Sequence, residues 1–191
     1  MTKEYLFSEI YPISDYSLKA SLVNATEVRK AEKNTYLYHQ GEDISTVYFL
    51  NYGIVSIHVI DKDGNIQCVD IINCPGDILT GYFSSYGVSS SFDIKMETKG
   101  EVFAVRKKDF QKILMNNPGV EFNNSLWGRL NKRRLDFVHM LYLCKATERY
   151  EWFIQRYPGV IERINHKIIA SFLRMSPITL SRITSGSGNC S

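Results

Sequence analysis

The stretch NHKIIASFLRMSPITLSRI, from Asn165 to Ile183, has the pattern of two short helices joined by a tight turn. Asn165 can cap a first helix of about two turns, because apolar residues recur after it at i, i+1, i+4 and i+5. Ser176-Pro177 can begin the second helix, since serine is a favoured N-cap and proline fits the first helical position. The apolar residues of the first helix are Ile168, Ile169, Phe172 and Leu173.

The second predicted helix has one apolar side and one open side. Leu180 and Ile183 are spaced by three residues and face inward, which leaves the opposite side for solvent or for a partner. Two helices joined by a turn of three or four residues form the helix-turn-helix geometry, whose second helix enters the major groove of DNA. Periodicity alone is equally consistent with a plain helical hairpin packed on a larger core. The candidate DNA-binding residues are Lys167, Arg174, Ser176, Ile178, Thr179, Ser181 and Arg182.

Positive charge is concentrated in the same part of the chain. Residues 1 to 120 contain 12 Lys and Arg against 15 Asp and Glu, a balance of −3, whereas residues 145 to 191 contain 7 against 3, a balance of +4. Lys167, Arg174 and Arg182 would lie closest to DNA phosphates, and such contacts supply the sequence-independent part of the affinity. The alternative interpretation is a solvated basic surface.

The region from about residue 20 to residue 110 is rich in short segments with strand character, separated by turn signals such as Asp61 to Asn65. In the segment IVSIHVI, Ile54, Ser56 and His58 alternate with Val55, Ile57 and Val59, which predicts a sheet with two unequal faces. Many short strands with regular turns are typical of a sandwich or barrel. The predicted strands are Thr35 to His39, Thr46 to Leu50, Ile54 to Ile60, Ile66 to Ile72, Ser91 to Glu97 and Glu101 to Val105.

After Pro118-Gly119 the hydrophobic period becomes helical, from about Val120 to Cys144. A helix of roughly 25 residues would be about 37 Å long, which is more than a β-domain needs for its own cover. The run NKRR, from Asn131 to Arg134, is predicted to lie on the solvated face of this helix. The apolar stripe consists of Leu126, Leu130, Phe137, Leu141 and Cys144.

The chain resembles the bacterial Crp/Fnr family of transcription regulators, particularly short members with an E-R-Y-E-x-F-x-x-x-Y-P-G segment before the helix-turn-helix. That segment here is ERYEWFIQRYPG, from Glu148 to Gly159. Upstream, four glycine landmarks resemble those of the family's β-roll. The resemblance covers roughly residues 10 to 183. The four landmarks are His39-Gln40-Gly41-Glu42, VYFLNYGIVSIHV with Gly53, Asp63-Gly64-Asn65, and Pro75-Gly76-Asp77.

The resemblance implies an α+β fold in four parts. Residues 1–117 would form a cyclic-nucleotide-binding-like β-roll (a jelly roll), 118–145 a long dimerisation helix, 146–184 the helix-turn-helix domain and 185–191 a disordered tail. Two subunits would pair through Leu126, Leu130, Phe137 and Leu141, so that a homodimer reads two half-sites one helical turn apart. The alternative is a helix packed only on its own β-domain. The eight residues after Ile183 are too few for the hairpin wing that many relatives carry.

The sensor region departs from members of the family that bind cyclic nucleotides. In those members a glutamate holds the ribose and an Arg-Ser pair holds the phosphate, because a buried phosphate needs a cationic partner. Alignment on Gly76-Asp77 places Gly81 at the glutamate position and Ser90-Ser91 at the Arg-Ser pair, so a cyclic nucleotide is not the expected effector. Lys95 could partly replace the arginine. The segment from Thr80 to Phe92 could line a pocket for an uncharged or apolar small molecule, or be a filled pocket or a loop. The candidate effector residues are Thr80, Gly81, Tyr82, Ser90, Ser91 and Lys95.

The second helix also departs from the family members that read G-T-G-A half-sites. Those members have an arginine and a glutamate after the serine cap, where this chain has Pro177 and Ile178; Thr179 and Arg182 match the later positions. Ile178 can make only apolar contacts, for instance with a thymine methyl, while Arg182 can bind guanine or phosphate. A different operator is therefore expected.

The sequence gives less support to an enzyme, a metal or cofactor protein, or a membrane protein than to a DNA-binding regulator. No paired carboxylates, nucleophile elbow, phosphate loop or metal-ligand spacing is present, so no enzyme, metal or cofactor is predicted. A β-roll ligand-binding or interaction module without specific DNA binding remains the alternative to a regulator. No apolar run of 18 residues and no signal-like N-terminus occurs, and the four cysteines have no Cys-x-x-Cys spacing, so a cytoplasmic protein with reduced thiols and no membrane partner is expected.

Overall fold

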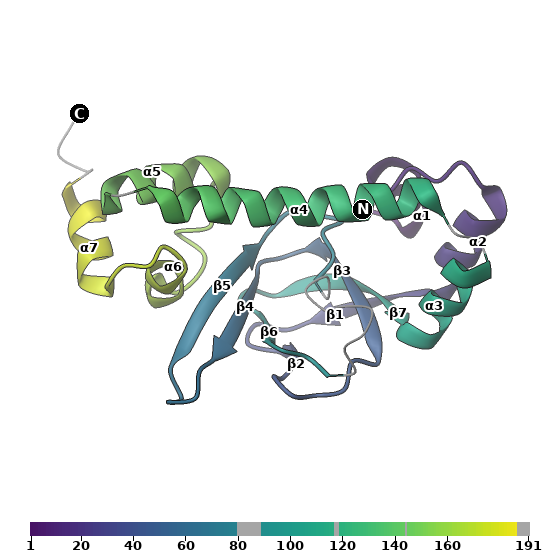
Figure 1. The fold of residues 1–191 in the computed structure, drawn as a ribbon, viewed down its shortest axis with the longest axis horizontal. Coiled ribbons are helices and arrows are strands. Elements are labelled where there is room, and N and C mark those ends of the chain that lie inside the picture. The colour runs from purple at the N-terminus through teal and green to yellow at the C-terminus, as the bar shows by residue number, and fades with distance from the viewer. Residues whose placement is uncertain (80–88, 117–118, 144, 187–191) are drawn as a thin grey trace.

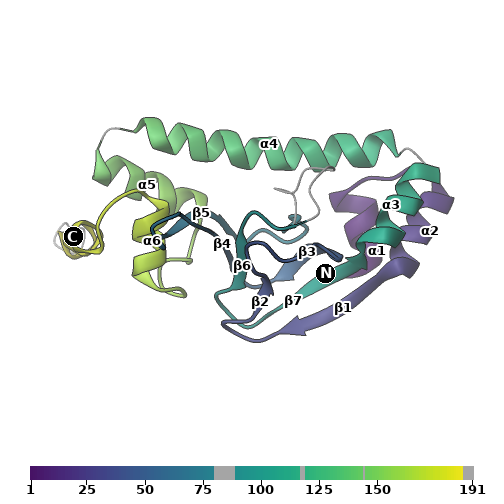
Figure 2. The same ribbon diagram turned by 60° about the horizontal axis from the view of Figure 1, so that its bottom comes forward.

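A β-roll lies beneath one long helix, and helical groups stand at both ends of that helix (Figures 1 and 2). The computed structural model describes residues 1–79, 89–116, 119–143 and 145–186. The strands, in chain order, are β1 (Thr26–Ala31), β2 (Tyr36–Tyr38), β3 (Thr46–Tyr52), β4 (Val55–Ile60), β5 (Ile66–Ile72), β6 (Asp93–Met96) and β7 (Gly100–Arg106). They form two antiparallel sheets with the orders β1-β7-β3 and β2-β6-β4-β5. The six strands predicted from the sequence are confirmed to within a few residues, whereas β1 was missed.

The interior of the roll is a cluster of apolar side chains that both sheets contribute. Val55 and Ile57 of β4 meet Leu50 of β3 and Val102 of β7 in this cluster, which is closed to solvent. The alternation predicted for β4 places Ser56 and His58 on the opposite face. That polar face is also buried, at 0% and 8% exposure, so both faces of β4 are covered.

The four glycine landmarks have a physical reason in the backbone, because each lies at positive φ, where a residue with a Cβ is strained. Gly76, at φ 84°, is also tightly packed: a Cβ there would lie 2.5 Å from Cγ2 of Ile10. The carbonyl of Gly76 accepts a hydrogen bond from the Tyr11 hydroxyl at 2.8 Å. Glycine at this position thus lets the N-terminal segment approach the loop before Asp77.

The N-terminal helices cover the outside of the three-stranded sheet. They are α1 (Lys3–Tyr5), a π-helical turn (Leu6–Ile10) and α2 (Tyr16–Ala25), and α3 (Lys107–Asn116) packs beside α2. Phe7 and Tyr11 from this group contact Phe49 of β3 at ring-centroid distances of 6.1 and 5.7 Å. Phe122, Leu126 and Leu130 of the long helix complete the same core cluster.

The long helix α4 is confirmed and spans Val120–Tyr142, 23 residues. In both views it runs above the roll from the N-terminal helices to the C-terminal group (Figures 1 and 2). That group contains α5 (Ala146–Arg156), α6 (His166–Phe172) and α7 (Pro177–Gly186). A third core cluster joins these helices to Met140 of α4 and to Cys68 and Ile71 of β5. The roll and the C-terminal helices therefore share buried apolar surface.

Candidate DNA-binding surface and sensor domain

The helices α6 and α7 begin at the residues that the sequence predicts. The side chain of Asn165 accepts a hydrogen bond from the backbone N–H of Lys167 at 2.9 Å, which caps α6. The Ser176 hydroxyl accepts one from the N–H of Thr179 at 3.0 Å, which caps α7 at Pro177. Both predicted caps are confirmed, and they satisfy backbone donors that have no partner within the helix.

The two sides of α7 differ as predicted. Leu180 is fully buried, whereas Ile178 is 66% exposed and Ser181 and Arg182 are exposed. Because Ile178 and Arg182 are four residues apart on a helix, their side chains lie next to each other on the open side. The hydroxyls of Ser176 and Thr179 bond to each other at 2.8 Å beside them. The open side of α7 thus presents one apolar, three hydroxyl and one cationic side chain.

The turn between α6 and α7 contains a strained residue. Arg174 has φ 54°, a left-handed conformation that is strained for a residue with a Cβ. Its guanidinium donates from Nη1 to Oε1 of Gln67 at 2.9 Å and lies 5.9 Å from the Phe137 ring centroid. Arg174 is therefore engaged with the roll and with α4, while Lys167 is exposed at the start of α6.

The ERYE segment holds the helix-turn-helix in place. Arg149 of α5 donates from Nε to the carbonyl of Leu173 and from Nη1 to the carbonyl of Leu143, both at 2.8 Å. It thereby satisfies a carbonyl at the end of α6 and another at the end of α4. Phe153 and Tyr157 lie against Phe172 at ring-centroid distances of 6.1 and 5.7 Å. The motif is thus a structural support for α6.

The candidate effector residues do not converge on one pocket in the described part of the chain. Thr80, Gly81 and Tyr82 lie outside the described residues. Ser90 is buried and its hydroxyl bonds to the carbonyl of Phe92, whereas Ser91 is exposed.

Lys95 points out of the roll interior, because its neighbours Ile94 and Met96 occupy the interior cluster and side chains alternate along a strand. Its ammonium pairs with Glu97 Oε1 at 3.5 Å. The suggestion that Lys95 replaces the missing arginine inside the roll is therefore wrong.

A row of buried polar groups covers the outer face of the four-stranded sheet. The Ser56 hydroxyl donates to Glu97 Oε1 at 2.7 Å and also lies 2.7 Å from Nε2 of His58. Burial lowers the pKa of His58, and the nearby Glu97 carboxylate only partly opposes this. His58 is a structural residue in this row.

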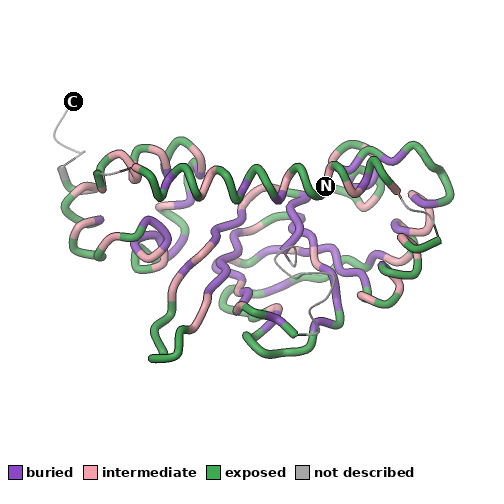
Figure 3. Tube along the Cα trace, in the orientation of Figure 1, coloured by how far each residue is buried: buried purple, intermediate pink, exposed green. Residues whose placement is uncertain are grey.

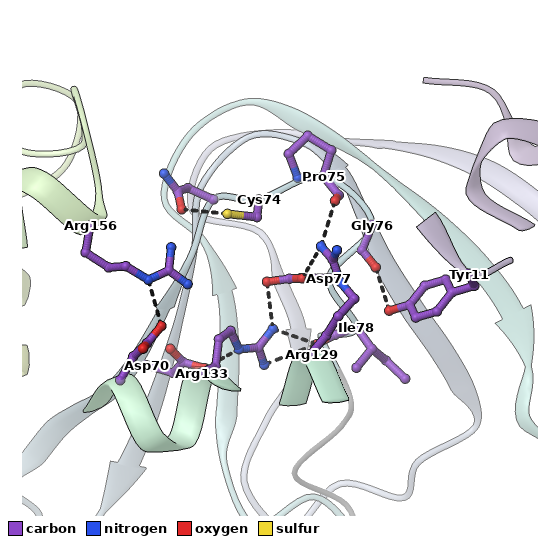
Figure 4. Close-up of polar contacts among 12 residues, drawn as sticks. Tyr11, Asp70, Cys74, Pro75, Gly76, Asp77, Ile78, Arg129, Arg133 and Arg156 are labelled. Carbon is purple, nitrogen blue, oxygen red and sulfur yellow. Dashed lines mark hydrogen bonds and ion pairs between the residues drawn. The ribbon is translucent and has the colours of Figure 1, made fainter. Parts of the chain in front are cut away.

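The run NKRR corrects the prediction that all four residues are solvated. Arg133 is 6% exposed and reaches from α4 into the roll, where Nε lies 3.2 Å from Asp70 Oδ2 and Nη1 3.2 Å from Asp77 Oδ2 (Figure 4). Arg129, one turn earlier, donates from Nε to Asp77 Oδ1 at 2.9 Å. Two arginines and two aspartates thus form an ion-pair network between α4, β5 and the loop after it, in which Arg129 is half-buried and the other three residues are buried. The periodicity of α4 could not reveal it, because the two carboxylates are far away in the sequence.

The predicted dimer stripe does not form one open face. Leu126 and Leu130 are 8% and 3% exposed and belong to the N-terminal core cluster, because the roll-facing side of α4 covers the aromatic side chains there. Phe137 packs against Phe172 at 5.4 Å, and Leu141 is 45% exposed. Exposed residues recur along α4 (Figure 3). The exposed apolar side chains of α4 other than Leu141 are Val120, Trp127, Leu135, Val138 and Tyr142.

Within the described ranges, no helix is both long enough and apolar enough to cross a membrane.

The sequence matches the model of the cyclic nucleotide-binding domain over residues 28–117. It is 26% identical to the anaerobic regulatory protein of Bacillus subtilis over 109 residues, which are 56% of this chain and 45% of that protein. It is 27% identical to the cAMP-activated global transcriptional regulator CRP of Escherichia coli O157:H7 over 95 residues, 49% of this chain and 44% of that protein. The chain spans less than half the length of these relatives.

The fold extends the likeness to nearly the whole chain. The c-di-GMP responsive global regulator CLP of Xanthomonas campestris superimposes with a TM-score of 0.69 at 14% identity, over 91% of this chain and 92% of that one. FixK2 of Bradyrhizobium japonicum gives 0.68 at 20% identity, over 84% and 83%. A Crp/Fnr family regulator of Eubacterium rectale gives 0.67 at 13% identity, over 88% and 81%. The chain therefore contains a region similar to the cyclic nucleotide-binding domain at residues 28–117, and it shares its fold of β-roll, long helix and C-terminal helical group with solved Crp/Fnr regulators.

Proposed function

We propose that this chain is a DNA-binding transcription regulator of the Crp/Fnr type, in which α6 and α7 form the helix-turn-helix. The observation that carries the proposal is the open side of α7, where Ile178, Ser181 and Arg182 are exposed although Leu180 between them is fully buried. Packing in a helical hairpin does not account for these three exposed side chains. Their combination of one apolar, one hydroxyl and one cationic group suits the major groove, where a methyl group, base edges and phosphates lie within reach of one helix.

The charges around α7 support the same proposal. Lys167 and Arg182 are exposed on the helix-turn-helix, within a C-terminal region whose balance of charged residues is +4. Phosphate contacts by such residues would give salt-dependent affinity for any DNA, whereas Arg182 or Ile178 at a base edge would give preference for one sequence. Thr179 and Ser176 would contribute hydroxyls at the first turn of α7.

Pairing of two subunits through α4 is the second part of the proposal. One helix-turn-helix buries little surface, and a two-fold symmetric dimer can contact two half-sites. The open side of α4 carries Trp127, Leu135, Val138 and Leu141, all 44% exposed or more within one chain. Such an apolar row along a helix is a surface that a second copy could cover. Leu141 is kept from the predicted stripe, and Trp127, Leu135 and Val138 are proposed in place of Leu126, Leu130 and Phe137.

We further propose that the effector is not a cyclic nucleotide. The cations that α4 places against the described part of the roll, buried Arg133 and half-buried Arg129, are already matched by Asp70 and Asp77. A cyclic phosphate would therefore have to displace a carboxylate. In a thermal unfolding assay, cyclic AMP and cyclic GMP should leave the melting temperature unchanged at millimolar concentration. A stabilisation that saturates with either nucleotide would contradict this part.

The DNA-binding proposal is tested by selecting duplexes from a random pool with the purified full chain. The proposal predicts that an inverted repeat is enriched, with half-site centres about one helical turn apart. Failure to enrich any sequence, together with no salt-dependent binding of the unselected pool, would contradict it.

A further inference from the structure

The helix-turn-helix is attached to the roll at a specific place, the edge strand β5 of the four-stranded sheet. The backbone N–H of Cys68 donates to the Ser171 hydroxyl of α6 at 2.9 Å. Beside this bond, the side chain of Gln67 accepts the hydrogen bond from Arg174. An edge strand presents backbone groups for pairing, and here a helix residue takes one of them.

Apolar contacts seal the same attachment. Cys68 and Ile71 of β5 have no exposed surface and share a cluster with Ile169 and Phe172 of α6. Burial raises the pKa of the Cys68 thiol, which keeps it protonated. We call Gln67, Cys68 and Ile71 the β5 platform. α6 and the turn that follows it are thus attached to β5 by apolar contacts and by side-chain hydrogen bonds.

Attachment to the β5 platform gives a reason for an arginine, Arg174, at the left-handed position of the turn. A left-handed conformation costs an L-residue about 1 kcal/mol, and glycine would avoid the cost. The arginine instead supplies a guanidinium that reaches both Gln67 of β5 and the Phe137 ring of α4. Arg174 thus joins the turn to two elements at once.

Docking on the platform leaves the DNA-reading side free. The side chains of Ser171 and Arg174 contact β5, Arg174 from an exposed position, whereas Ile178 and Arg182 lie exposed on α7. The residues that contact the roll are therefore different from those on the open side of α7. Figure 1 shows α7 at the outer end of the molecule, with α6 between it and the sheet. The docked arrangement is therefore compatible with contact between α7 and a duplex.

We propose that the β5 platform holds the helix-turn-helix in its DNA-binding orientation, with Arg174 and Ser171 as positioning residues. The inference rests on the DNA-binding function proposed above, and it moves Arg174 from the candidate phosphate contacts to the contacts with the roll. A reading helix that is already oriented loses less conformational freedom on binding, which raises affinity. Because Asp70 of the same strand pairs with Arg133 of α4, β5 also links the reading helix to the sensor core.

The first test measures DNA affinity by fluorescence anisotropy for Gln67→Ala, Arg174→Ala and the double variant, on a duplex selected by the parent protein. Gln67→Ala should weaken binding about 3- to 10-fold with an unchanged salt dependence, because it removes a positioning contact and no charge. The double variant should be no weaker than Arg174→Ala alone. The inference is overturned if Gln67→Ala binds like the parent while Arg174→Ala loses affinity and about one unit of salt slope, since Arg174 would then be a phosphate contact.

The second test needs no DNA and uses the buried Cys68 thiol as a reporter. N-ethylmaleimide labelling of Cys68, followed by peptide mass mapping, should be slow in the parent and several-fold faster in Gln67→Ala, Arg174→Ala and Ser171→Ala. Urea unfolding measures whether global stability has changed, and the faster labelling should exceed any such change. Arg106→Ala is the matched control, because Arg106 pairs with Asp109 at 2.7 Å on the other sheet.

Equal labelling of the parent and all three platform variants would overturn the inference. If the parent binds no DNA, the DNA-binding proposal fails, and faster labelling would then support the platform as an attachment site alone.

Discussion

Ile178 is an apolar residue that lies exposed on the open side of α7. Its side chain is 66% exposed at the first turn of α7, two residues from the fully buried Leu180. The sequence predicts this exposure, because the i, i+3 spacing of Leu180 and Ile183 places Ile178 on the opposite side of the helix. A thymine methyl in the major groove is the apolar partner that such a side chain can reach.

This assignment predicts an atomic effect on binding. Replacing the contacted thymine of the selected duplex by deoxyuridine removes one methyl group and should weaken the parent by about 0.8 kcal/mol, or about fourfold in Kd. Ile178→Ala should bind the thymine and deoxyuridine duplexes equally. Deoxyuridine scanning by anisotropy checks this, and if no thymine position affects the parent, Ile178 does not read a methyl.

His58 predicts a pH effect on stability. Its folded pKa lies below the ordinary value because the imidazole is buried, so the unfolded chain takes up a proton first as the pH falls. The free energy of unfolding should therefore decrease as the pH drops from above about 6.5 towards the lowered folded pKa. In His58→Gln this part of the decrease should be absent in urea unfolding at about pH 7.5 and 5.5. His166→Gln, at an exposed histidine, is the control; an identical decrease in His58→Gln and the parent would refute the assignment.

At the scale of elements, strands with strong alternation were predictable and those without it were not. The segment TEVRKA of β1 buries only its two end residues, so its sequence carries almost no apolar pattern. The helix α2 likewise buries just Leu18 and Leu22, which a short window does not separate from chance. β1 is stabilised by its antiparallel pairing with β7, and α2 by the core cluster that Leu18 and Leu22 join. No local pattern encodes these tertiary contacts.

The ion-pair network between α4 and β5 gives a stability prediction. Arg133→Ala leaves Asp70 and part of Asp77 buried without their cation and should cost about 3–5 kcal/mol in the free energy of unfolding. Lys132→Ala, at the exposed neighbouring position of the same helix, should change it by less than about 0.5 kcal/mol. Urea denaturation followed by circular dichroism measures both. Similar midpoints for the two variants would show that the network contributes little.

In the whole molecule, α4 contributes to two core clusters. Its roll-facing side completes the N-terminal core through Phe122, Leu126 and Leu130, and Met140 near its end joins the C-terminal cluster. Sequence periodicity identified the helix and its apolar residues correctly. Periodicity alone cannot distinguish the apolar residues of α4 that are buried within the chain from those that stay exposed. This distinction depends on how the N-terminal helices pack against α4.

The exposed row of α4 gives a prediction for assembly. Leu135→Glu places a charge in the apolar row, so light scattering should report a monomer at concentrations where the parent is a dimer. Leu130→Glu should instead lower the free energy of unfolding, since Leu130 is 3% exposed in the chain's own core. Lys132→Glu is the control, because it introduces the same side chain at an exposed position outside the apolar row, and it should remain dimeric. A dimeric, folded Leu135→Glu variant would exclude this face as the interface.

DNA reading by α7 is measured by the ratio of Kd values for a selected duplex and its shuffled counterpart, determined by anisotropy for the parent and for Arg182→Ala. The parent should prefer the selected duplex by about 10³-fold or more, with an affinity that falls steeply as salt rises. Arg182→Ala should lose about 1–3 kcal/mol on the selected duplex and much less on the shuffled one. Equal affinity of the parent for both duplexes, or no salt-dependent binding to either, would contradict the assignment of α7 as a reading helix.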